Sequence, residues 1–142
     1  SLNIMIAGDQ ILPRISPNIG VRPNEPDANP LQDWLRSCES FKNKLDKDVL
    51  ILPSHGDPFY GAHLRLQAMI DEHNTGLKKL HNFCSEPRSV IDVFPVLFKS
   101  KINSGNMVIA VGEALAHLNY LIALGDLEVT TNSDGIAKYK QT

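Results

Sequence analysis

Two short apolar runs, each followed closely by a polar side chain, constrain the fold of this 142-residue chain more than any other feature. The first run, residues 4–9, ends on the carboxylate of Asp9, and the second, residues 49–52, is soon followed by His55. Runs of this length predict buried strands that deliver one polar side chain each to the edge of a sheet. A carboxylate and an imidazole placed in this way are candidate metal ligands, although a zinc site needs three or four protein ligands.

The segment between the two runs predicts one amphipathic helix. Asn29 is a typical N-cap residue, and Pro30 suits the first helical position. Apolar side chains then recur at spacings of three and four along one face: Leu31, Trp34, Leu35, Cys38, Phe41 and Leu45. Because a helix between two strands is the arrangement of a βαβ unit, the sequence predicts an α/β layer. Residues 10–29, which contain four prolines, predict a long irregular loop.

The rest of the chain predicts a long helix followed by further, shorter elements. The long helix covers residues 62–84, and the composition changes at Ser85, where we place a domain boundary. Beyond this boundary we expect a short helix that is capped by Ser89 and interrupted at Pro95. A second helix over residues 107–124 follows, with Gly125 as the residue that ends it.

The chain ends in a predicted hairpin over residues 127–139, with a Gly-containing turn. Helix, helix and hairpin in this order are typical of a winged helix. The sequence therefore predicts an α/β domain over residues 1–84 and a winged-helix domain over residues 85–142.

Charge argues against nucleic acid as the main partner. The chain carries 14 basic and 16 acidic residues, which gives a net charge of −2. From residue 85 onward there are five basic and six acidic side chains. Residues 107–124, where a winged helix would place its base contacts, contain Glu113 and no Lys or Arg. Because phosphate binding needs clustered cations, we do not expect this chain to bind duplex DNA.

Composition also bears on the cellular compartment. Cys38 and Cys84 both fall in helical patterns, which predicts no disulfide framework and favours a reducing, cytoplasmic location. The first residues lack the basic start and the long apolar core of a signal peptide. No apolar run approaches the roughly 20 residues that span a bilayer, so we expect no membrane partner.

Five motifs spread over nearly the whole chain carry a family resemblance. They are residues 8–18 (GDQILPRISPN), 29–31 (NPL), 52–58 (LPSHGDP), 87–90 (PRSV) and 112–118 (GEALAHL). In this order they resemble the metallo-β-lactamase-fold hydrolases, in the branch called lactamase-β-2-like. The resemblance implies that the chain holds the C-terminal half of the family's αβ/βα sandwich, followed by a small winged-helix domain.

The resemblance also implies a metal site. Asp9 matches the family's metal-bridging aspartate and His55 matches its last histidine ligand, so both are the predicted catalytic and metal-binding residues of a two-zinc site. The family's His-x-His-x-Asp-His motif does not occur in this sequence. We therefore expect the chain to be part of a zinc-dependent hydrolase that acts on a small-molecule thioester, acyl or related ester substrate, and to be inactive alone.

Partners follow from the half-sandwich that the resemblance implies. A sheet without its other half leaves an apolar face or an unpaired edge in water, which favours association. We expect either a homodimer or association with the missing half. The alternatives to a hydrolase are a non-catalytic binding or scaffold fragment and a winged-helix regulator.

Simpler roles for the polar residues remain open. Asp9 could cap the turn that follows it, and His55 could be a structural histidine. Asp57 is expected to fix its loop rather than to bind metal. His81 and Cys84, three residues apart on the long helix, could share a metal ion. Two further histidines, His63 and His73, are expected to be solvated or packed, and His117 is expected to be a core-edge histidine with a hydrogen bond.

Overall fold

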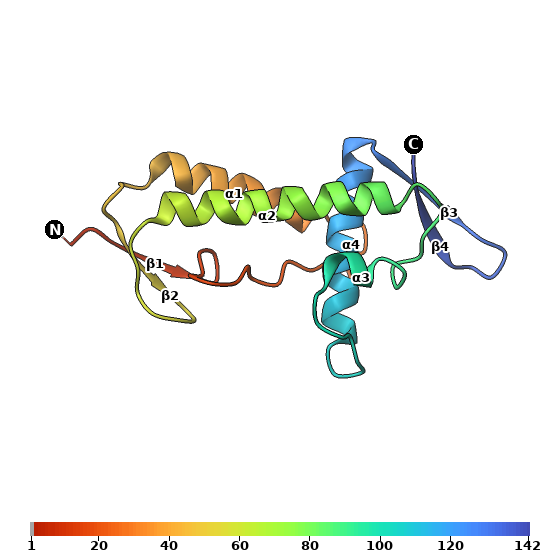
Figure 1. Cartoon of the computed structure of the whole chain (residues 1–142), viewed down its shortest axis with the longest axis horizontal. Helices are drawn as coiled ribbons and strands as arrows, with labels where there is room; N and C mark the ends of the chain where they lie inside the picture. The colour runs from red at the N-terminus through yellow and green to blue at the C-terminus, as the bar shows by residue number, and fades with distance from the viewer. Residues whose placement is uncertain (1) are drawn as a thin grey trace. The chain divides into compact units, whose positions relative to one another are not determined.

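The computed structural model describes residues 2–142; Ser1, the first residue of the predicted α/β domain, lies outside the described residues. The elements follow in the order β1, α1, β2, α2, α3, α4, β3 and β4 (Figure 1). The chain divides into two compact units. Unit 1 runs up to Pro17 and resumes at Asp33–His73, and unit 2 comprises Asn18–Gln32 and Asn74–Thr142. The predicted domain boundary at Ser85 stays a prediction.

The predicted βαβ arrangement is confirmed. Strand β1 (Ile4–Gly8) pairs in parallel with β2 (Leu50–Pro53), and helix α1 (Pro30–Lys44) lies between them in the sequence. The side-chain oxygen of Asn29 accepts a hydrogen bond from the Gln32 amide at 3.3 Å, so Asn29 caps α1 as expected. Its predicted apolar face is buried at four positions: Leu31, Trp34, Leu35 and Cys38.

The prediction that both strands are buried is wrong for β1. Ile51 on β2 has no exposed surface, but Ile6 on β1 is 84% exposed and Ile4 is 40% exposed. The reason is that β1 pairs only with β2 in the described part of the chain, in a sheet of two strands. Parallel strands are normally covered on both faces, so β1 leaves unusual apolar surface open to water.

The long loop is irregular, as predicted, and it is well anchored in both units. Residues 10–29 contain no helix or strand. In unit 1, Ile11 and Leu12 are almost completely buried. In unit 2, Ile19 and Val21 are buried as well. This loop therefore contributes to the core and does not hang free in solvent.

Helix α2 (Ala62–Phe83) has the bounds and the apolar stripe that the sequence predicted, apart from one residue at its end. Its buried side chains recur at helical spacing through both units: Leu66, Met69, Ile70, His73, Leu77 and Leu80. One continuous helix thus contributes core residues to both units.

The short helix differs from its prediction. Ser89 and Asp92 cap each other's backbone in a turn, with hydrogen bonds of 2.7 and 3.4 Å. The helix itself, α3 (Phe94–Leu97), begins later and has Pro95 in its first turn. Proline is tolerated there because the first helical N–H groups have no partner within the helix. Pro95 therefore begins this helix, whereas we expected it to interrupt one.

Helix α4 (Met107–Leu124) has the predicted bounds, and Gly125 ends it in the left-handed conformation, with φ of 80°. Gly112 lets the loop approach closely, because a Cβ atom there would lie 2.9 Å from the carbonyl oxygen of Val21. The Val21 amide donates to the Gly112 carbonyl at 2.9 Å. The core of unit 2 is therefore built around a helix on which the loop lies directly.

By length and composition alone, α4 is one helix that could cross a membrane, although 39% of this span is buried inside the protein. The sequence-based statement that no apolar run approaches that length was therefore wrong. The core helix of a water-soluble protein meets the same criteria, so the absence of a membrane partner stays a prediction.

The predicted hairpin is confirmed. Strands β3 (Leu127–Thr131) and β4 (Ala137–Gln141) pair antiparallel. On its other edge, Tyr139 of β4 exchanges two backbone hydrogen bonds with Arg88, of 2.9 and 2.8 Å. Leu127 and Tyr139 are buried. The helix–helix–hairpin order is thus present, with a short extended segment paired to the second strand.

Candidate metal centre

The structure brings Asp9 and His55 together in unit 1. Strand β1 ends at Gly8 and β2 ends at Pro53, and the Ser54 amide donates to the Gly8 carbonyl at 3.0 Å. Parallel strands present their carboxyl ends at the same edge of a sheet, where ligands commonly bind. Nε2 of His55 accordingly lies 3.6 Å from Oδ1 of Asp9.

Ser54 holds the carboxylate of Asp9, which the sequence analysis did not anticipate. The Ser54 hydroxyl donates a hydrogen bond to Oδ1 of Asp9, the oxygen that faces His55. A partner of this kind fixes the orientation of a metal-binding carboxylate and leaves its second oxygen available. The available sequence signal was the position of Ser54 directly before the candidate histidine.

The two loops that carry Asp9 and His55 pack on each other. Gly56 has φ of +85°, and a Cβ atom there would lie 2.7 Å from Cγ of Pro13. Only glycine meets both requirements without a shift of the neighbouring chain. The close packing of Pro13 on Gly56 therefore holds the loop that follows Asp9 against the loop that carries His55.

Arg65, near the start of α2, holds this loop in place and was also missed by the sequence analysis. Its Nε donates to the Leu12 carbonyl at 2.6 Å, one residue before Pro13. The side chains of Leu12 and of Ile11, the residue before it, are buried. Nη2 of Arg65 is buried and has no hydrogen-bond partner among residues 2–142. Arg65 thus ties α2 to the loop that follows Asp9.

Exposure distinguishes this pair from a structural ion pair. The side chains of Asp9 and His55 are 64% and 72% exposed. Even with a protonated imidazole, an exposed pair of this kind contributes only about 0–1 kcal/mol to stability. The arrangement therefore does little for the fold, and it leaves both side chains accessible to a ligand.

The donor types fit zinc, whereas their number does not. Carboxylate oxygen and imidazole nitrogen are both zinc ligands, held here on strand ends. Among the residues that the structure describes, no three or more His, Cys, Asp or Glu side chains are grouped to hold a metal ion. Residues 2–142 therefore offer part of a metal site, and no reaction step can be assigned to a metal held by them alone.

The other histidines take packed roles in their units. His73 is buried, its ring lies 4.8 Å from that of Trp34, and its Nδ1 lies 2.9 Å from the Met69 carbonyl oxygen. His117 is buried on α4, with Nδ1 2.8 Å from the Glu113 carbonyl oxygen. His73 is thus packed, the second of its two expected states, and His117 is buried beside a backbone carbonyl oxygen, as expected for a core-edge histidine with a hydrogen bond.

The idea of a metal shared by His81 and Cys84 gains no support. The Gln141 side chain donates to the His81 carbonyl at 2.8 Å and lies 3.4 Å from its Nδ1. The Cys84 side chain has no exposed surface, and burial raises the pKa of its thiol. Burial likewise raises the pKa of Cys38 to about 11. Both cysteines are free and buried.

Comparisons with known proteins show which proteins this chain resembles. Residues 77–142 match the family described as metallo-beta-lactamase-like, C-terminal domain. A solved beta-lactamase domain protein from Burkholderia ambifaria is 37% identical, with a TM-score of 0.93 over 98% of this chain. A metallo-beta-lactamase family protein from Thermus thermophilus is 24% identical, with a TM-score of 0.82 over 99% of this chain, and shows similarity of fold alone. No curated protein matches the chain.

The chain corresponds to less than half of each of these two proteins. Almost all of this chain is matched, but it spans only 41% of the Burkholderia protein and 42% of the Thermus protein. The resemblance noted in the sequence is therefore confirmed: the chain has the fold of the C-terminal part of metallo-β-lactamase-like proteins, and its residues 77–142 match their C-terminal domain.

Proposed function

We propose that this chain supplies two ligands, Asp9 and His55, to the two-zinc site of a metallo-β-lactamase-like hydrolase. The observation that carries the proposal is the distance of 3.6 Å between Nε2 of His55 and Oδ1 of Asp9 at the ends of two paired parallel strands. The other ligands would come from protein outside residues 2–142. When bound, paired zinc ions lower the pKa of a bridging water and polarise the group that is attacked.

The chain's own residues prepare the site. Ser54 orients the Asp9 carboxylate through Oδ1, so that its other oxygen can face a metal. Arg65 and Pro13 hold the loop that follows Asp9 against the loop that carries His55. These contacts hold two ligands at fixed positions before any metal binds, which reduces the cost of assembling the site.

The finer parts of the proposal concern substrate and partners. The substrate class is a small-molecule thioester, acyl or related ester, and the setting is cytoplasmic. Ile4 and Ile6 on β1 form the apolar surface that a partner would cover, either a second copy or the remaining part of the family's sandwich. By itself the chain would bind zinc weakly and would not hydrolyse the substrate.

The winged-helix assignment of residues 85–142 belongs to this proposal. It is supported by the order of α3, α4 and the hairpin, and by the segment at Arg88 that pairs with β4. The absence of cations on α4 makes this domain a packing or cleft-shaping element, with no role in reading duplex DNA.

A non-catalytic binding or scaffold role is the second candidate. It is supported by the ligand count, because two donors do not make a catalytic zinc site. The two candidates differ in what Asp9 and His55 do, since a scaffold needs neither side chain.

Zinc titration of the isolated chain, followed on the imidazole resonances of His55, tests the ligand assignment. We expect weak, saturable binding that is lost in Asp9→Asn and in His55→Gln. Asp57→Asn, in the same exposed loop, is the matched control and should bind as the wild type does. Binding that survives Asp9→Asn would contradict the assignment, and so would tight stoichiometric zinc in the isolated chain.

Hydrolysis needs a separate test in a complete protein. The matching segment of the Burkholderia protein can be replaced by this chain, and the chimera assayed with thioester and ester substrates and for zinc content. We expect activity that depends on Asp9 and His55 and tolerates Asp57→Asn. A folded chimera that binds zinc without hydrolysing these substrates would agree with the ligand assignment and would contradict the proposed substrate class.

A further inference from the structure

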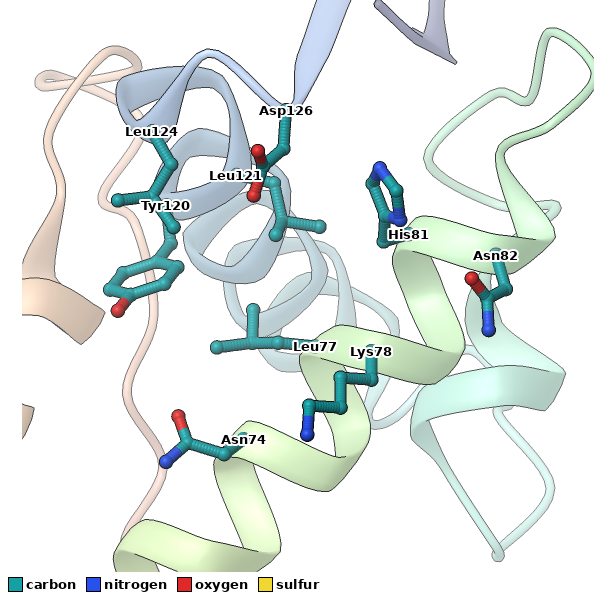
Figure 2. Close-up of a pocket in the computed structure, with 9 residues that line it drawn as sticks. All are labelled: Asn74, Leu77, Lys78, His81, Asn82, Tyr120, Leu121, Leu124 and Asp126. Carbon is teal, nitrogen blue, oxygen red and sulfur yellow. The ribbon is translucent and has the colours of Figure 1, made fainter.

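Unit 2 contains a second feature, which the metal site does not use: an open groove of about 480 Å³ between α2 and α4 (Figure 2). That volume lies within the range of about 300–1,000 Å³ that is typical of small-molecule sites. The lining residues all belong to unit 2: Asn74, Leu77, Lys78, His81, Asn82, Tyr120, Leu121, Leu124 and Asp126.

The floor of the groove is apolar. Leu77 and Leu121, one from each helix, are each 4% exposed and point toward one another in Figure 2. Leu124 is 53% exposed at the groove's side. An apolar floor with polar groups around it is the usual composition of a ligand site, because apolar contact supplies affinity and the polar groups fix orientation.

The two ends of the groove differ in charge. Figure 2 shows the ammonium group of Lys78 extending toward Asn74 at one end. The carboxylate of Asp126 and the imidazole of His81 lie at the other end. Within residues 2–142, neither the Lys78 nor the Asp126 side chain has an ion-pair partner. A ligand could therefore neutralise both, provided that it carries an anion and a cation at opposite ends.

The length of the groove sets the size of such a ligand. Asn74 and His81 are seven residues apart on α2, which corresponds to about 10 Å along the helix axis. Three residues of extended peptide span about 10 Å. The chemical class that fits is a linear zwitterion of that length with an apolar middle.

We propose that this groove binds short zwitterionic peptides, with the carboxylate end near Lys78 and Asn74 and the ammonium end near Asp126. The apolar middle side chain lies on Leu77 and Leu121. The site is distinct from the Asp9–His55 pair, lies wholly in unit 2, and needs no metal and no hydrolysis.

Nuclear magnetic resonance of the ¹⁵N-labelled chain with Ala-Leu-Ala, its ends free, tests the proposal. We expect saturable shifts at millimolar peptide, confined to the backbone amides of residues 74–82 and 120–126. Raising the salt concentration should weaken binding, because the contacts are between exposed charges. N-acetyl-Ala-Leu-Ala-amide, which keeps the apolar middle and lacks both charges, should bind more weakly.

Charge variants decide whether the two ends act as proposed. Lys78→Met and Asp126→Asn should each weaken binding about two- to five-fold, the loss expected for one solvent-exposed ion pair. Lys79→Met and Glu128→Gln, which change neighbouring exposed charges outside the groove, should leave binding unchanged. The spectrum of each free variant shows whether it is folded.

Three results would overturn the proposal. They are equal binding of the blocked peptide, shifts that map elsewhere in the chain, and no saturable shift at millimolar concentration. Equal losses in the two control variants would likewise show that the groove charges have no specific role.

Discussion

The two strand pairs of this chain differ in how completely they are covered. In unit 2, β4 pairs with β3 on one edge and with the segment at Arg88 on the other, and Tyr139 on β4 is only 6% exposed. In unit 1, β2 is likewise bridged on its second edge, by Phe59, but the described residues leave the apolar side chains of β1 open, and Ile6 is 84% exposed. The strand pairs therefore differ in burial: an antiparallel pair can face water on one side, whereas a parallel pair is normally covered on both faces. The candidate metal ligands Asp9 and His55 lie in the unit whose sheet is less covered.

The largest expected effect contrasts one residue from each pair. Tyr139→Ala should lower the free energy of unfolding by about 3–5 kcal/mol, the range for a buried aromatic side chain. Ile6→Ala should change it by no more than about 0.5 kcal/mol, because an exposed side chain loses little on truncation. Chemical denaturation of both variants measures the difference. A loss of several kcal/mol for Ile6→Ala would show that β1 is packed in solution.

The dependence of stability on protein concentration tests whether a second copy of the chain covers β1. If a second copy covers β1, the stability of the wild type should rise with protein concentration, and Ile6→Ala should abolish that rise. Ile6→Ala would then matter for association alone. A stability that is independent of concentration would instead leave β1 open, or reserved for another partner.

A smaller effect is expected from close packing in unit 2. Gly112→Ala should lower the free energy of unfolding by about 1–3 kcal/mol, because the added Cβ would lie 2.9 Å from the Val21 carbonyl oxygen. Gly76→Ala on α2 is the matched control, since nothing lies within 4 Å of its added Cβ. It should stabilise by up to about 1 kcal/mol through helix propensity. Thermal unfolding of the two variants measures these stability changes, which should have opposite signs.

The free cysteines report which unit opens first. Cys38 in unit 1 and Cys84 in unit 2 are both fully buried, so alkylation requires local opening. We expect Cys38 to be modified several-fold faster in the native state, because its unit has the less complete sheet. Mass spectrometry after pulsed alkylation, corrected by the rates in denaturant, measures the order. Faster modification of Cys84 would reverse the comparison.

The smallest effect concerns Glu113 of α4. Burial raises the pKa of this carboxyl group, although a hydrogen bond from Asn18 opposes the shift. The folded state therefore favours the protonated form, so stability from this group is present at acidic pH and is lost as the pH rises through its folded pKa. Glu113→Gln should slightly raise the free energy of unfolding at neutral pH. Glu128→Gln, on an exposed strand position, should not.

Local signals made much of the fold predictable. The N-cap at Asn29 and the left-handed Gly125 act within one turn of their helices, so the sequence located both helix ends. The exposure of Ile6 was not predictable, because it depends on which other strands pair with β1. Pro95 was ambiguous for a different reason, since proline both begins helices and interrupts them.

The candidate site also contains residues that the sequence predicted and contacts that it did not. Asp9 and His55 were predicted because each lies at or shortly after the end of an apolar run and matches a family motif. Arg65 contacts the loop of Asp9 from 53 residues away, and the hydroxyl of Ser54 reaches a carboxylate 45 residues away. Contacts of this range are set by tertiary structure, and no periodicity in the sequence records them.

Helix α4 leaves the ribosome before the hairpin that follows it. Residues 127–141 are synthesised after residues 107–124, so the newly made helix has no β3 or β4 to pack against. During that interval the face of this apolar helix that β3 contacts in the folded protein is open, although the loop and α3, which also contact α4, are already made. Transiently exposed apolar surface of this kind aggregates readily and is what chaperones bind. The exposure of this helix face therefore ends only when the hairpin of β3 and β4 has formed.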